Sequence, residues 1–560
     1  MASYIFVSGG VISGIGKGVT SAAIAVLLKE QGYKICIVKC ENYINIDSGT
    51  INPIEHGDPF LTQDGTESDM DLGTYERFLD IEMSIDNFIT IGQVYQTIIK
   101  KERAFMYKGR TVDPTEEVTK EIIERIKRVQ RKTKSDFVIV ELGGTAGEYQ
   151  NVFYYEASRR MQYLEKEKVI HIHVAYAPIP AHLGEPKSKP IQLSVKTLNG
   201  MGIQPDFVVV RSDGPFDERR RQKLSSYCNL DSDDIIENPN VKDTIYEIPQ
   251  ILNEQDFSQR IIKKVNSRYH TRLRSKKIKL DKWNTLTSKV IKLDNSKSKA
   301  KKIMIVGKYF ATGKFVLADS YAALIESLKH ASWNLEKKIE LIFVNSETEE
   351  NNMDNILKDA DGIIVPIGWG ERGAEGKIKA ITYARTHKIP YLGLCYGMQL
   401  ACVEWARNVL NIKNANTTEN DSKTKYPIIH VIPEEERYVR IKSKGVTMRL
   451  GGYDCIIKHG TLAYKIYTKY KESFRKIEGS KDILTNERHR HRYEFNNEYR
   501  KQFEDSGFVF SGTSPDNFFV EMIELSSKDH PFFLATQAHP EYKSTPLNPH
   551  PIFLEYIKTV

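Results

Sequence analysis

The 560-residue chain has few cysteines and no long apolar run. Six cysteines are too few and too scattered for a disulfide framework or a paired zinc site: Cys36, Cys40, Cys228, Cys395, Cys402 and Cys455. No stretch approaches the roughly 20 apolar residues that a membrane span requires, and strand-like residues 4–7 open the chain without a basic leader. These absences predict a soluble protein of a reducing compartment, the cytoplasm, with no membrane partner.

Basic charge is concentrated in one segment. The formal net charge is +8, but residues 263–302 hold fifteen lysines and arginines against two aspartates, so the rest of the chain is acidic overall. A nucleic-acid-binding protein spreads its basic residues over a folded face, whereas this excess lies in a polar stretch typical of a linker. We therefore expect no nucleic-acid partner.

Short apolar runs alternate with helical patterns on both sides of the basic stretch. The first series lies at residues 5–7, 35–38, 137–140, 170–175 and 207–210, and a second at 303–306, 341–344, 362–365 and 391–394. Such alternation predicts βαβ units. The sequence therefore predicts an α/β protein of two domains, residues 1–270 and 301–560, each a mostly parallel sheet flanked by helices, with a basic linker at 271–300.

Cys395 lies on a turn flanked by glycines. The run GLCYG at residues 393–397 follows an apolar strand and precedes a helix beginning near Met398. An elbow of this kind needs glycines because side chains at the neighbouring positions would collide on its strained turn. The N–H groups of Tyr396 and Gly368 are candidate oxyanion-hole donors. The alternative is a buried structural cysteine, since free cysteine is among the most buried residue types.

A histidine and a carboxylate far downstream are candidate partners for this thiol. The run QAHPE at 537–541 follows an apolar stretch, and in an extended segment His539 and Glu541 point to the same side. The imidazole would deprotonate the Cys395 thiol and later return a proton to departing ammonia, while the carboxylate orients the ring. A lone histidine in a strand would instead be structural.

Together these motifs resemble the class I glutamine amidotransferases over residues 301–560. The resemblance rests on GLCYGMQ at 393–399 and HPE at 539–541, and it implies glutamine hydrolysis by a triad of Cys395, His539 and Glu541. It also implies a set of glutamine-binding and oxyanion-hole residues: Gly368, Tyr396, Gly397, Met398, Gln399, Glu419 and Arg492. Glu419 suits an α-ammonium group and Arg492 an α-carboxylate, although the Arg/His run at 488–494 would by itself equally suit a solvated face. Ile367 departs from the family, which usually has a glycine there.

A glycine-rich loop near the amino terminus is a candidate phosphate-binding loop. Residues 8–20, SGGVISGIGKGVT, lie between the first strand and the first helix. Their backbone N–H groups, the charge of Lys17 and the helix start would all face phosphates. Gly18 replaces the usual Ser or Thr. Asp71 and Glu141 are candidate metal ligands, because Glu141 ends a strand where α/β sheets bind ligands, although either acid alone would more often be a surface charge.

Five motifs in this half resemble the CTP synthase family, and the resemblance spans nearly the whole chain. They are GGVISGIGKG at 9–18, DG at 64–65, DMDLGTYERF at 69–78, ELGGT at 141–145 and KSKP at 187–190. The resemblance implies a carbon–nitrogen ligase that performs the last step of de novo CTP biosynthesis. ATP would phosphorylate the uracil 4-oxygen of UTP, and ammonia from glutamine, delivered through an internal tunnel, would displace the phosphate.

The family pattern also implies the nucleotide sites. ATP would bind Gly14, Ile15, Gly16, Lys17, Gly18, Val19, Lys39, Asp71, Asn240, Val241 and Lys242, with Mg²⁺ on Asp71 and Glu141. UTP and the inhibitor CTP would bind Ser13, Glu148, Tyr149, Gln150, Lys187, Ser188, Lys189, Pro190, Ile191, Gln192 and Lys223. The resemblance further implies activation by GTP and a homotetramer that polymerises into filaments.

Several departures from the family pattern bear on regulation. Glu148 and Gln150 stand where the family usually has two acidic residues, Glu41-Asn42 replaces an Asp-Pro pair, and residues 112–115 lack the usual Gln and Pro-His. Two alternatives remain open at this point: another P-loop amidoligase, such as a cobyrinate-type amidase, and a filament-forming scaffold with decayed sites. The lysines of 187–189 argue against the first, since a corrinoid has no triphosphate, and the intact catalytic residues argue against the second.

Overall fold

The computed structural model describes residues 2–51, 59–308, 311–312, 315–316, 321–432, 448–470 and 473–560. The chain divides into two compact units: Met1–Thr50 with Asp71–Ile291, and Ile51–Met70 with Lys292–Val560. Among the described residues, no helix is both long and apolar enough to cross a membrane.

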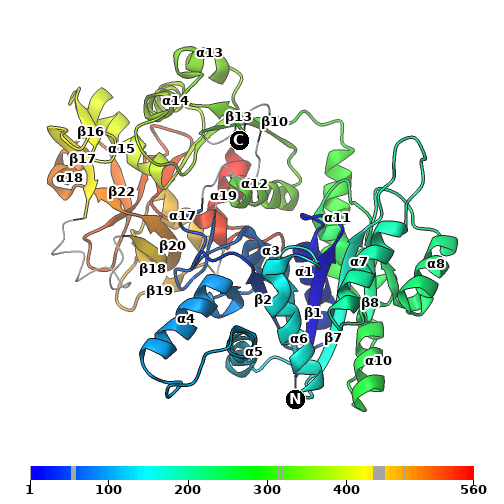
Figure 1. The fold of residues 1–560 in the computed structure, drawn as a ribbon. Helices are drawn as coiled ribbons and strands as arrows, with labels where there is room; N and C mark the ends of the chain where they lie inside the picture. Colours follow the sequence, from blue (N-terminus) through cyan, green and yellow to red (C-terminus); the bar gives the residue numbers. More distant parts are fainter. Residues whose placement is uncertain are drawn as a thin grey trace. The chain divides into compact units, whose positions relative to one another are not determined.

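The first unit is built on a seven-stranded sheet whose strands are all parallel (Figure 1). Its order is β5 (Phe88–Thr90), β2 (Ile35–Glu41), β6 (Phe137–Leu142), β1 (Ser3–Gly10), β7 (Lys168–Tyr176), β8 (Phe207–Arg211) and β9 (Ile235–Glu237). The central strands are apolar along their length because helices cover both faces. In the β1–β6 register Val7 pairs with Glu141, which places the phosphate loop and this carboxylate at the same sheet edge.

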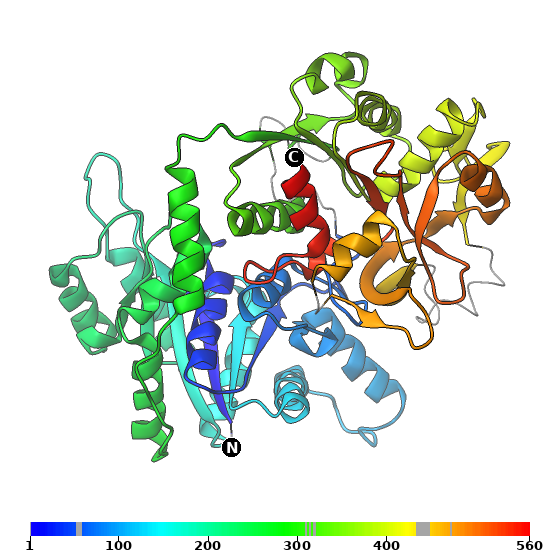
Figure 2. The same cartoon turned by 180° about the vertical axis from the view of Figure 1, so that it is seen from behind.

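Helices pack on both faces of this sheet. One face carries α4 (Ile91–Arg103), α5 (Pro114–Thr133), α6 (Val152–Tyr163), α7 (Lys189–Gly200) and α8 (Glu218–Cys228). The other carries α1 (Lys17–Glu30), α9 (Ile248–Asn253) and α10 (Phe257–Tyr269), and α3 is Met70–Leu79. Figure 2 shows α1, in dark blue, from this second side. Within the divergent 112–115 segment, Asp113 caps α5 by accepting a hydrogen bond from the Glu116 amide (3.1 Å).

The second unit has a ten-stranded sheet that changes from parallel to antiparallel. Its order is β13 (Ile339–Asn345), β10 (Lys301–Gly307), β14 (Gly362–Val365), β15 (Tyr391–Leu394), β24 (Phe533–Thr536), β23 (Val520–Glu524), β22 (Val509–Thr513), β18 (Arg449–Ile457), β20 (Ile483–His491) and β19 (Arg475–Lys476). The first five strands are parallel, as the sequence predicts. From β24 onward each pairing is antiparallel, which the alternation of strands and helices did not indicate.

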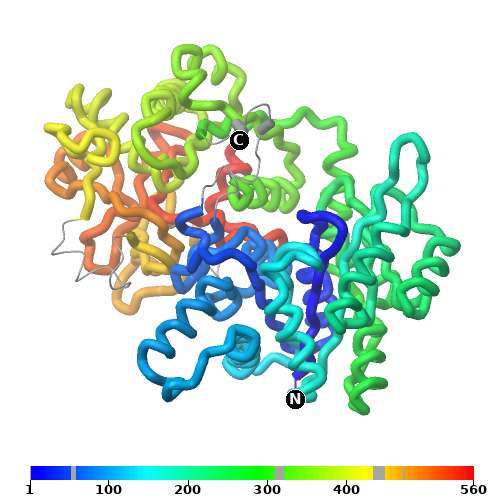
Figure 3. Tube along the Cα trace, in the orientation of Figure 1, coloured from blue at the N-terminus to red at the C-terminus, as the bar shows by residue number. Residues whose placement is uncertain are grey.

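Helices also cover this second sheet on both faces. One face carries α13 (Met353–Leu357), α14 (Ala374–His387) and α15 (Tyr396–Asn408), and the other α12 (Ala322–Leu335), α17 (Leu462–Thr468) and α19 (Pro551–Thr559). The trace in Figure 3 ends in red at α19, which packs on α12. A small sheet joins β16 (Ala415–Thr417), β17 (Tyr426–Val431) and β21 (Tyr493–Phe495), and α18 is Arg500–Asp505. Two-residue strands β11 (Ala311–Thr312) and β12 (Phe315–Val316) pair with each other.

The segment expected to be a basic linker contains a helix. Residues Asp281–Asp294 form α11, and its Trp283 is buried and stacks with Phe78 and Tyr246 at ring separations of 5.7 and 5.8 Å. Three of the ten lysines and arginines of residues 271–300, Lys282, Lys289 and Lys292, therefore lie on a helix anchored by an aromatic cluster, and the other seven flank that helix.

Residues 59–68 belong to the second unit, although they lie early in the sequence. There β3 (Phe60–Leu61) and β4 (Glu67–Ser68) form an antiparallel hairpin in which Phe60 pairs with Ser68. We call residues 59–68 the early hairpin.

Candidate active sites

Cys395 lies at the carboxyl end of β15, where the chain turns into α15. Its φ of 52° and ψ of −101° are a strained conformation for a residue with a side chain. The flanking glycines are sterically required: a Cβ at Gly397 would lie 2.0 Å from the Val365 carbonyl oxygen, and one at Gly393 would lie 2.8 Å from Ala535. The turn presents the thiol at the start of a helix, where the free N–H groups favour negative charge.

His539 and Glu541 form a buried pair in the same unit. The His539 Nδ1 lies 2.8 Å from a Glu541 carboxylate oxygen, and the imidazole is fully buried. Burial opposes the imidazolium form, but Glu541 and Cys395 raise the pKa of His539 to about 10. The extended segment that we expected is absent here: β24 ends at Thr536 and Glu541 lies in a 3₁₀ turn at Pro540–Lys543, because Pro540 starts a helical turn. The turn brings the two side chains together all the same.

The loop at residues 368–372 is held beside Cys395 by several polar groups. Glu419 accepts a hydrogen bond from the Gly370 amide (2.8 Å), and the Tyr396 hydroxyl donates to the Gly370 carbonyl (3.0 Å). The buried Lys308 ammonium donates to the Trp369 carbonyl and to the Arg372 carbonyl (3.2 Å). This network holds Gly368 close to the Tyr396 ring, which is compatible with the predicted oxyanion hole of Gly368 and Tyr396.

Lys377 of α14 is a buried amine that the motifs did not indicate. Its Nζ lies 5.1 Å from the centre of the Tyr396 ring and 2.6 Å from where a Cβ on Gly368 would be, and it has no hydrogen-bond partner among the described residues. Burial and the nearby Lys308 lower the pKa of Lys377 to about 7. A side chain at position 368 would therefore displace this amine.

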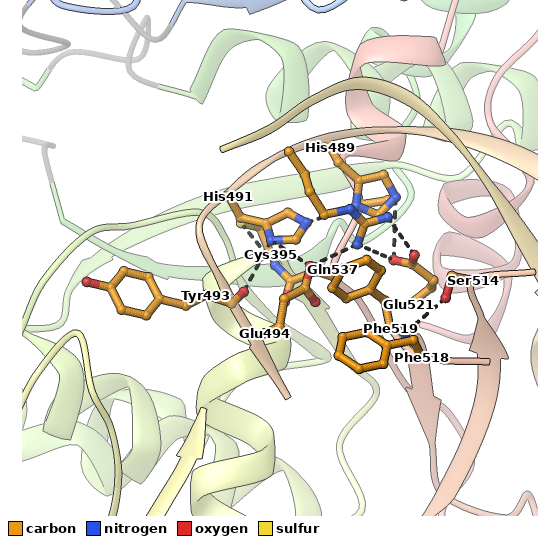
Figure 4. Close-up of polar contacts among 12 residues, drawn as sticks. Cys395, His489, His491, Tyr493, Glu494, Ser514, Phe518, Phe519, Glu521 and Gln537 are labelled. Carbon is orange, nitrogen blue, oxygen red and sulfur yellow. Dashed lines mark hydrogen bonds and ion pairs between the residues drawn. The ribbon is translucent and has the colours of Figure 1, made fainter. Parts of the chain in front are cut away.

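A buried network of charged side chains lies next to Cys395 (Figure 4). The Gln537 amide approaches the Cys395 sulfur at 3.6 Å, and His491 lies 3.0 Å from His489. Arg449 pairs with Glu494 (2.9 Å) and with Glu521 (2.7 Å), and all three are almost inaccessible. Burial and the neighbouring Glu521 raise the pKa of Glu494 to about 8, whereas Arg449 opposes this shift.

The remaining residues predicted to bind glutamine lie around this centre. Tyr396, Gly397, Met398 and Gln399 form the first turn of α15, where Gln399 donates to the Tyr493 carbonyl (3.1 Å). Arg492 is exposed after β20, and its charge acts on Glu419.

In the first unit the phosphate loop joins β1 to α1. Gly14 and Gly16 have φ of 67° and 85°, so backbone conformations that favour glycine expose the loop amides. Lys17 starts α1 and donates to the Gly144 carbonyl (2.7 Å), and burial lowers its pKa. A Cβ at Gly18 would overlap the Asp71 carboxylate, which explains why this loop has no larger residue after its lysine.

Three carboxylates surround the buried ammonium of Lys39. It forms an ion pair with Asp71, lies 3.0 Å from Glu141 and 3.2 Å from Glu41, and is 4 % exposed. Although burial disfavours the charged form, these carboxylates raise the pKa of Lys39 well above its usual value. Burial in turn raises the pKa of Glu141 despite the attraction of Lys39. Oxygen ligands crowded in this way suit Mg²⁺, and Glu41 is a member that the motifs did not single out.

The other residues predicted to bind nucleotides are more dispersed in the first unit. Asn240 accepts a hydrogen bond from Arg211 (2.6 Å), and Arg211 lies next to Gly16, so the structure brings Asn240 close to the phosphate loop. Ser188 precedes α7, whose first residues are Lys189, Pro190, Ile191 and Gln192, and Ile191 is a core residue. The Glu148 carboxylate accepts hydrogen bonds from the Thr145 amide and from Gln150. Ser13, Tyr149, Lys223 and Lys242 are exposed, Val241 is half-buried, and Lys187 pairs with Glu185.

The two units together define a class of enzyme. One has a glycine-rich loop beside a cluster of carboxylates, and the other has a cysteine on a strained turn together with a histidine–carboxylate pair at the edge of an α/β sheet. A nucleotide-dependent ligase fused to a glutamine amidotransferase combines these two features.

Comparison with known proteins identifies the family. The model of the CTP synthase N-terminus matches residues 3–267, and that of class I glutamine amidotransferases matches residues 316–559. The CTP synthase of Caldanaerobacter subterraneus subsp. tengcongensis is 44 % identical over 100 % of this chain and 98 % of its own length, and that of Bacillus subtilis is 42 % identical over 100 % and 98 %. The chain belongs to the CTP synthase family.

A solved structure also matches part of the chain. The glutaminase domain of Trypanosoma brucei CTPS, with bound acivicin, is 31 % identical and covers 46 % of this chain and 93 % of its own, with a TM-score of 0.40.

Proposed function

We propose that this chain makes CTP by the ATP-dependent amination of UTP at carbon 4, with nitrogen from glutamine. The observation that carries the proposal is that one chain of this family contains both the Cys395 elbow and a site with Lys17, Asp71 and Glu141. Residues 1–270 would be the synthetase, 301–560 the glutaminase, and 271–300 the connection between them.

Glutamine hydrolysis begins with the thiolate of Cys395. His539, held by Glu541, is in its imidazolium form at neutral pH because its pKa is raised. The thiolate attacks the amide carbon, the carbonyl oxygen becomes negative beside the N–H groups of Gly368 and Tyr396, and His539 gives its proton to the nitrogen as the C–N bond breaks. Neutral His539 then takes a proton from water, which cleaves the thioester to glutamate. Glu419 and Arg492 would hold the two ends of the substrate.

The first unit would transfer phosphate from ATP to UTP. The amides of residues 14–19 and Lys17 suit the phosphates of ATP, and Asn240 to Lys242 would contact its base. Mg²⁺ would bind Asp71 and Glu141 and neutralise charge on the transferred group. Lys39 lies between these carboxylates and would stabilise the same charge. The UTP segment would combine Ser13, Glu148 to Gln150, Lys187 to Gln192 and Lys223, and CTP would inhibit at an overlapping site.

Regulation and assembly complete the proposal. GTP would activate glutamine hydrolysis, ammonia would travel through an internal tunnel, and four copies would form a tetramer that polymerises into filaments. All six cysteines are buried and unpaired, which supports a reducing compartment such as the cytoplasm.

Cys395→Ala tests the division of labour between the units. We expect the variant to lose CTP formation from glutamine but to keep CTP formation from added ammonia. Both activities can be measured by the absorbance of CTP in reactions with UTP, ATP and Mg²⁺. Cys402→Ala, at another buried cysteine on α15, is the matched control and should keep both activities. Loss of both activities in Cys395→Ala would refute separate sites.

Glu141→Gln tests the first unit. Removing this carboxylate takes away one proposed Mg²⁺ ligand, so CTP formation should be lost with either nitrogen source. Ammonia-dependent synthesis at the wild-type rate would exclude Glu141 as a metal ligand.

A further inference from the structure

The early hairpin lies against β20, next to the catalytic cysteine and histidine. Arg488 donates to the Leu61 carbonyl (2.9 Å), and the Arg490 guanidinium donates to the Glu67 carboxylate (2.6 Å). At the turn, Gly65 has a φ of 88°, and a Cβ there would lie 2.9 Å from the Leu450 carbonyl oxygen. Shape and polar contacts therefore fit the hairpin closely to β18 and β20.

The same two arginines contact the catalytic residues through their backbone. The Arg488 carbonyl accepts a hydrogen bond from the His539 amide (2.8 Å), and the Arg490 carbonyl lies 3.8 Å from the Cys395 sulfur. Both arginines are at most 5 % exposed. Each arginine therefore contacts the hairpin with its side chain and a catalytic residue with its carbonyl group. For Arg488 that residue is His539, and for Arg490 it is Cys395.

Aromatic contacts repeat this connection. Phe60 packs edge-on against Tyr542, with ring centres 5.2 Å apart, and Tyr542 stacks on the His539 imidazole at 5.2 Å. The Arg490 guanidinium lies 5.5 Å from the centre of the Trp369 ring, next to Gly368 in the oxyanion loop. The hairpin therefore supports His539 through Phe60 and the Cys395 side of the site through Glu67.

We propose that the early hairpin is a positioning element of the glutaminase site, and that Glu67 acts through Arg490 on Cys395 and the oxyanion loop. The inference rests on the proposed glutamine hydrolysis. Loss of the Glu67 carboxylate removes one acceptor from the buried guanidinium of Arg490 and so changes how this side chain is held. Because Arg490 provides the carbonyl beside the nucleophile, even a small shift of this residue misaligns the attack.

The test measures glutamate release by full-length Glu67→Gln. We expect kcat for glutamine hydrolysis to fall at least tenfold while KM changes less than threefold, because the substrate-binding residues stay in place. Ammonia-dependent CTP formation should remain within twofold of wild type. The control is Glu555→Gln, which removes a carboxylate that pairs with Lys469 at the same 2.6 Å but lies on α19.

Two further variants separate positioning from a general loss of structure. Arg490→Gln combined with Glu67→Gln should be no slower than the slower single variant, since both act through one contact. Phe60→Leu, which keeps an apolar side chain at this position, should shift the pH profile of glutamine hydrolysis, because Tyr542 stacks on His539.

Wild-type kcat in Glu67→Gln, or additive losses in the double variant, would overturn the inference. An equal loss of ammonia-dependent synthesis would also overturn it, because that result indicates general disruption. Glutamate release by wild type without CTP formation from either nitrogen source would refute the proposed function instead.

Discussion

We expect Lys377 to make the second unit less stable than it would be with an apolar residue at this position. Each pKa unit is worth about 1.4 kcal/mol, so lowering the pKa of a buried lysine from 10.5 to about 7 costs the folded state roughly 5 kcal/mol where both states are protonated. Lys377→Met keeps the length of the side chain and removes this cost. The variant should therefore be more stable than wild type at pH 6.

The sign of the pH dependence follows from the direction of the shift. Between pH 7 and 10.5 the unfolded chain binds more protons at this lysine than the folded protein does, so the free energy of unfolding rises with pH in this range. The destabilising effect of the lysine is therefore largest below pH 7 and disappears as the pH approaches 10.5. The groups facing Lys377 are Lys308, Tyr396, Cys395 and Glu419. The advantage of the methionine variant should thus shrink steadily from pH 7 to pH 10.

Thermal unfolding of the full chain at pH 6, 8 and 10 provides the assay. Half of the calculated cost would raise Tm by about 5 °C or more in a unit of this size. Lys379→Met, on the same helix but at an exposed ion pair with Glu350, is the matched control. A Tm for Lys377→Met equal to or below wild type at pH 6 would refute the reasoning. We also expect at least a tenfold loss of glutamine hydrolysis, because the amine next to Gly368 of the proposed oxyanion hole is lost.

Two other substitutions test the second unit. Glu541→Gln removes the main attraction that raises the pKa of His539. The kcat for glutamate release should therefore fall by about 10²-fold or more, and the pH profile of this reaction should move to lower pH. An unchanged profile would contradict this role of Glu541. Arg449→Met leaves Glu494 and Glu521 buried without their cation, at a cost of about 3–5 kcal/mol, so Tm should drop in calorimetry at pH 8; an unchanged Tm would show that the network is not stabilising.

The sequence predicted the features that depend on neighbouring residues. The Cys395 elbow could be predicted because the cysteine and its glycines lie within five positions, and each glycine meets a backbone or side-chain atom that excludes a Cβ. The phosphate loop is readable for the same reason. The pairing of His539 with Glu541 was also predicted, but by a strand geometry that Pro540 replaces with a 3₁₀ turn.

Lys377 was missed although a signal was present. Ala374, Ile378, Ile381 and Ala384 form the buried face of α14, and a lysine at position 377 falls on that face rather than on the solvent side. A charged residue within an apolar helical stripe indicates a buried cation. Sequence motifs of neighbouring residues do not report on helical faces, so this residue was absent from the predicted site.

The early hairpin could not be predicted from local patterns. Glu67 and Arg490 are separated by 423 positions, and in the sequence each taken alone has the pattern of an ordinary surface charge. Only the fold places residues 59–68 in the same unit as β20. The chain then runs from Ser68 through Asp69 into α3, which carries Asp71. Few residues separate Glu67 from Asp71, so the segment proposed to support the glutaminase site continues directly into the helix that carries a proposed Mg²⁺ ligand. Insertions in this segment should therefore reduce both glutamine hydrolysis and ammonia-dependent CTP formation.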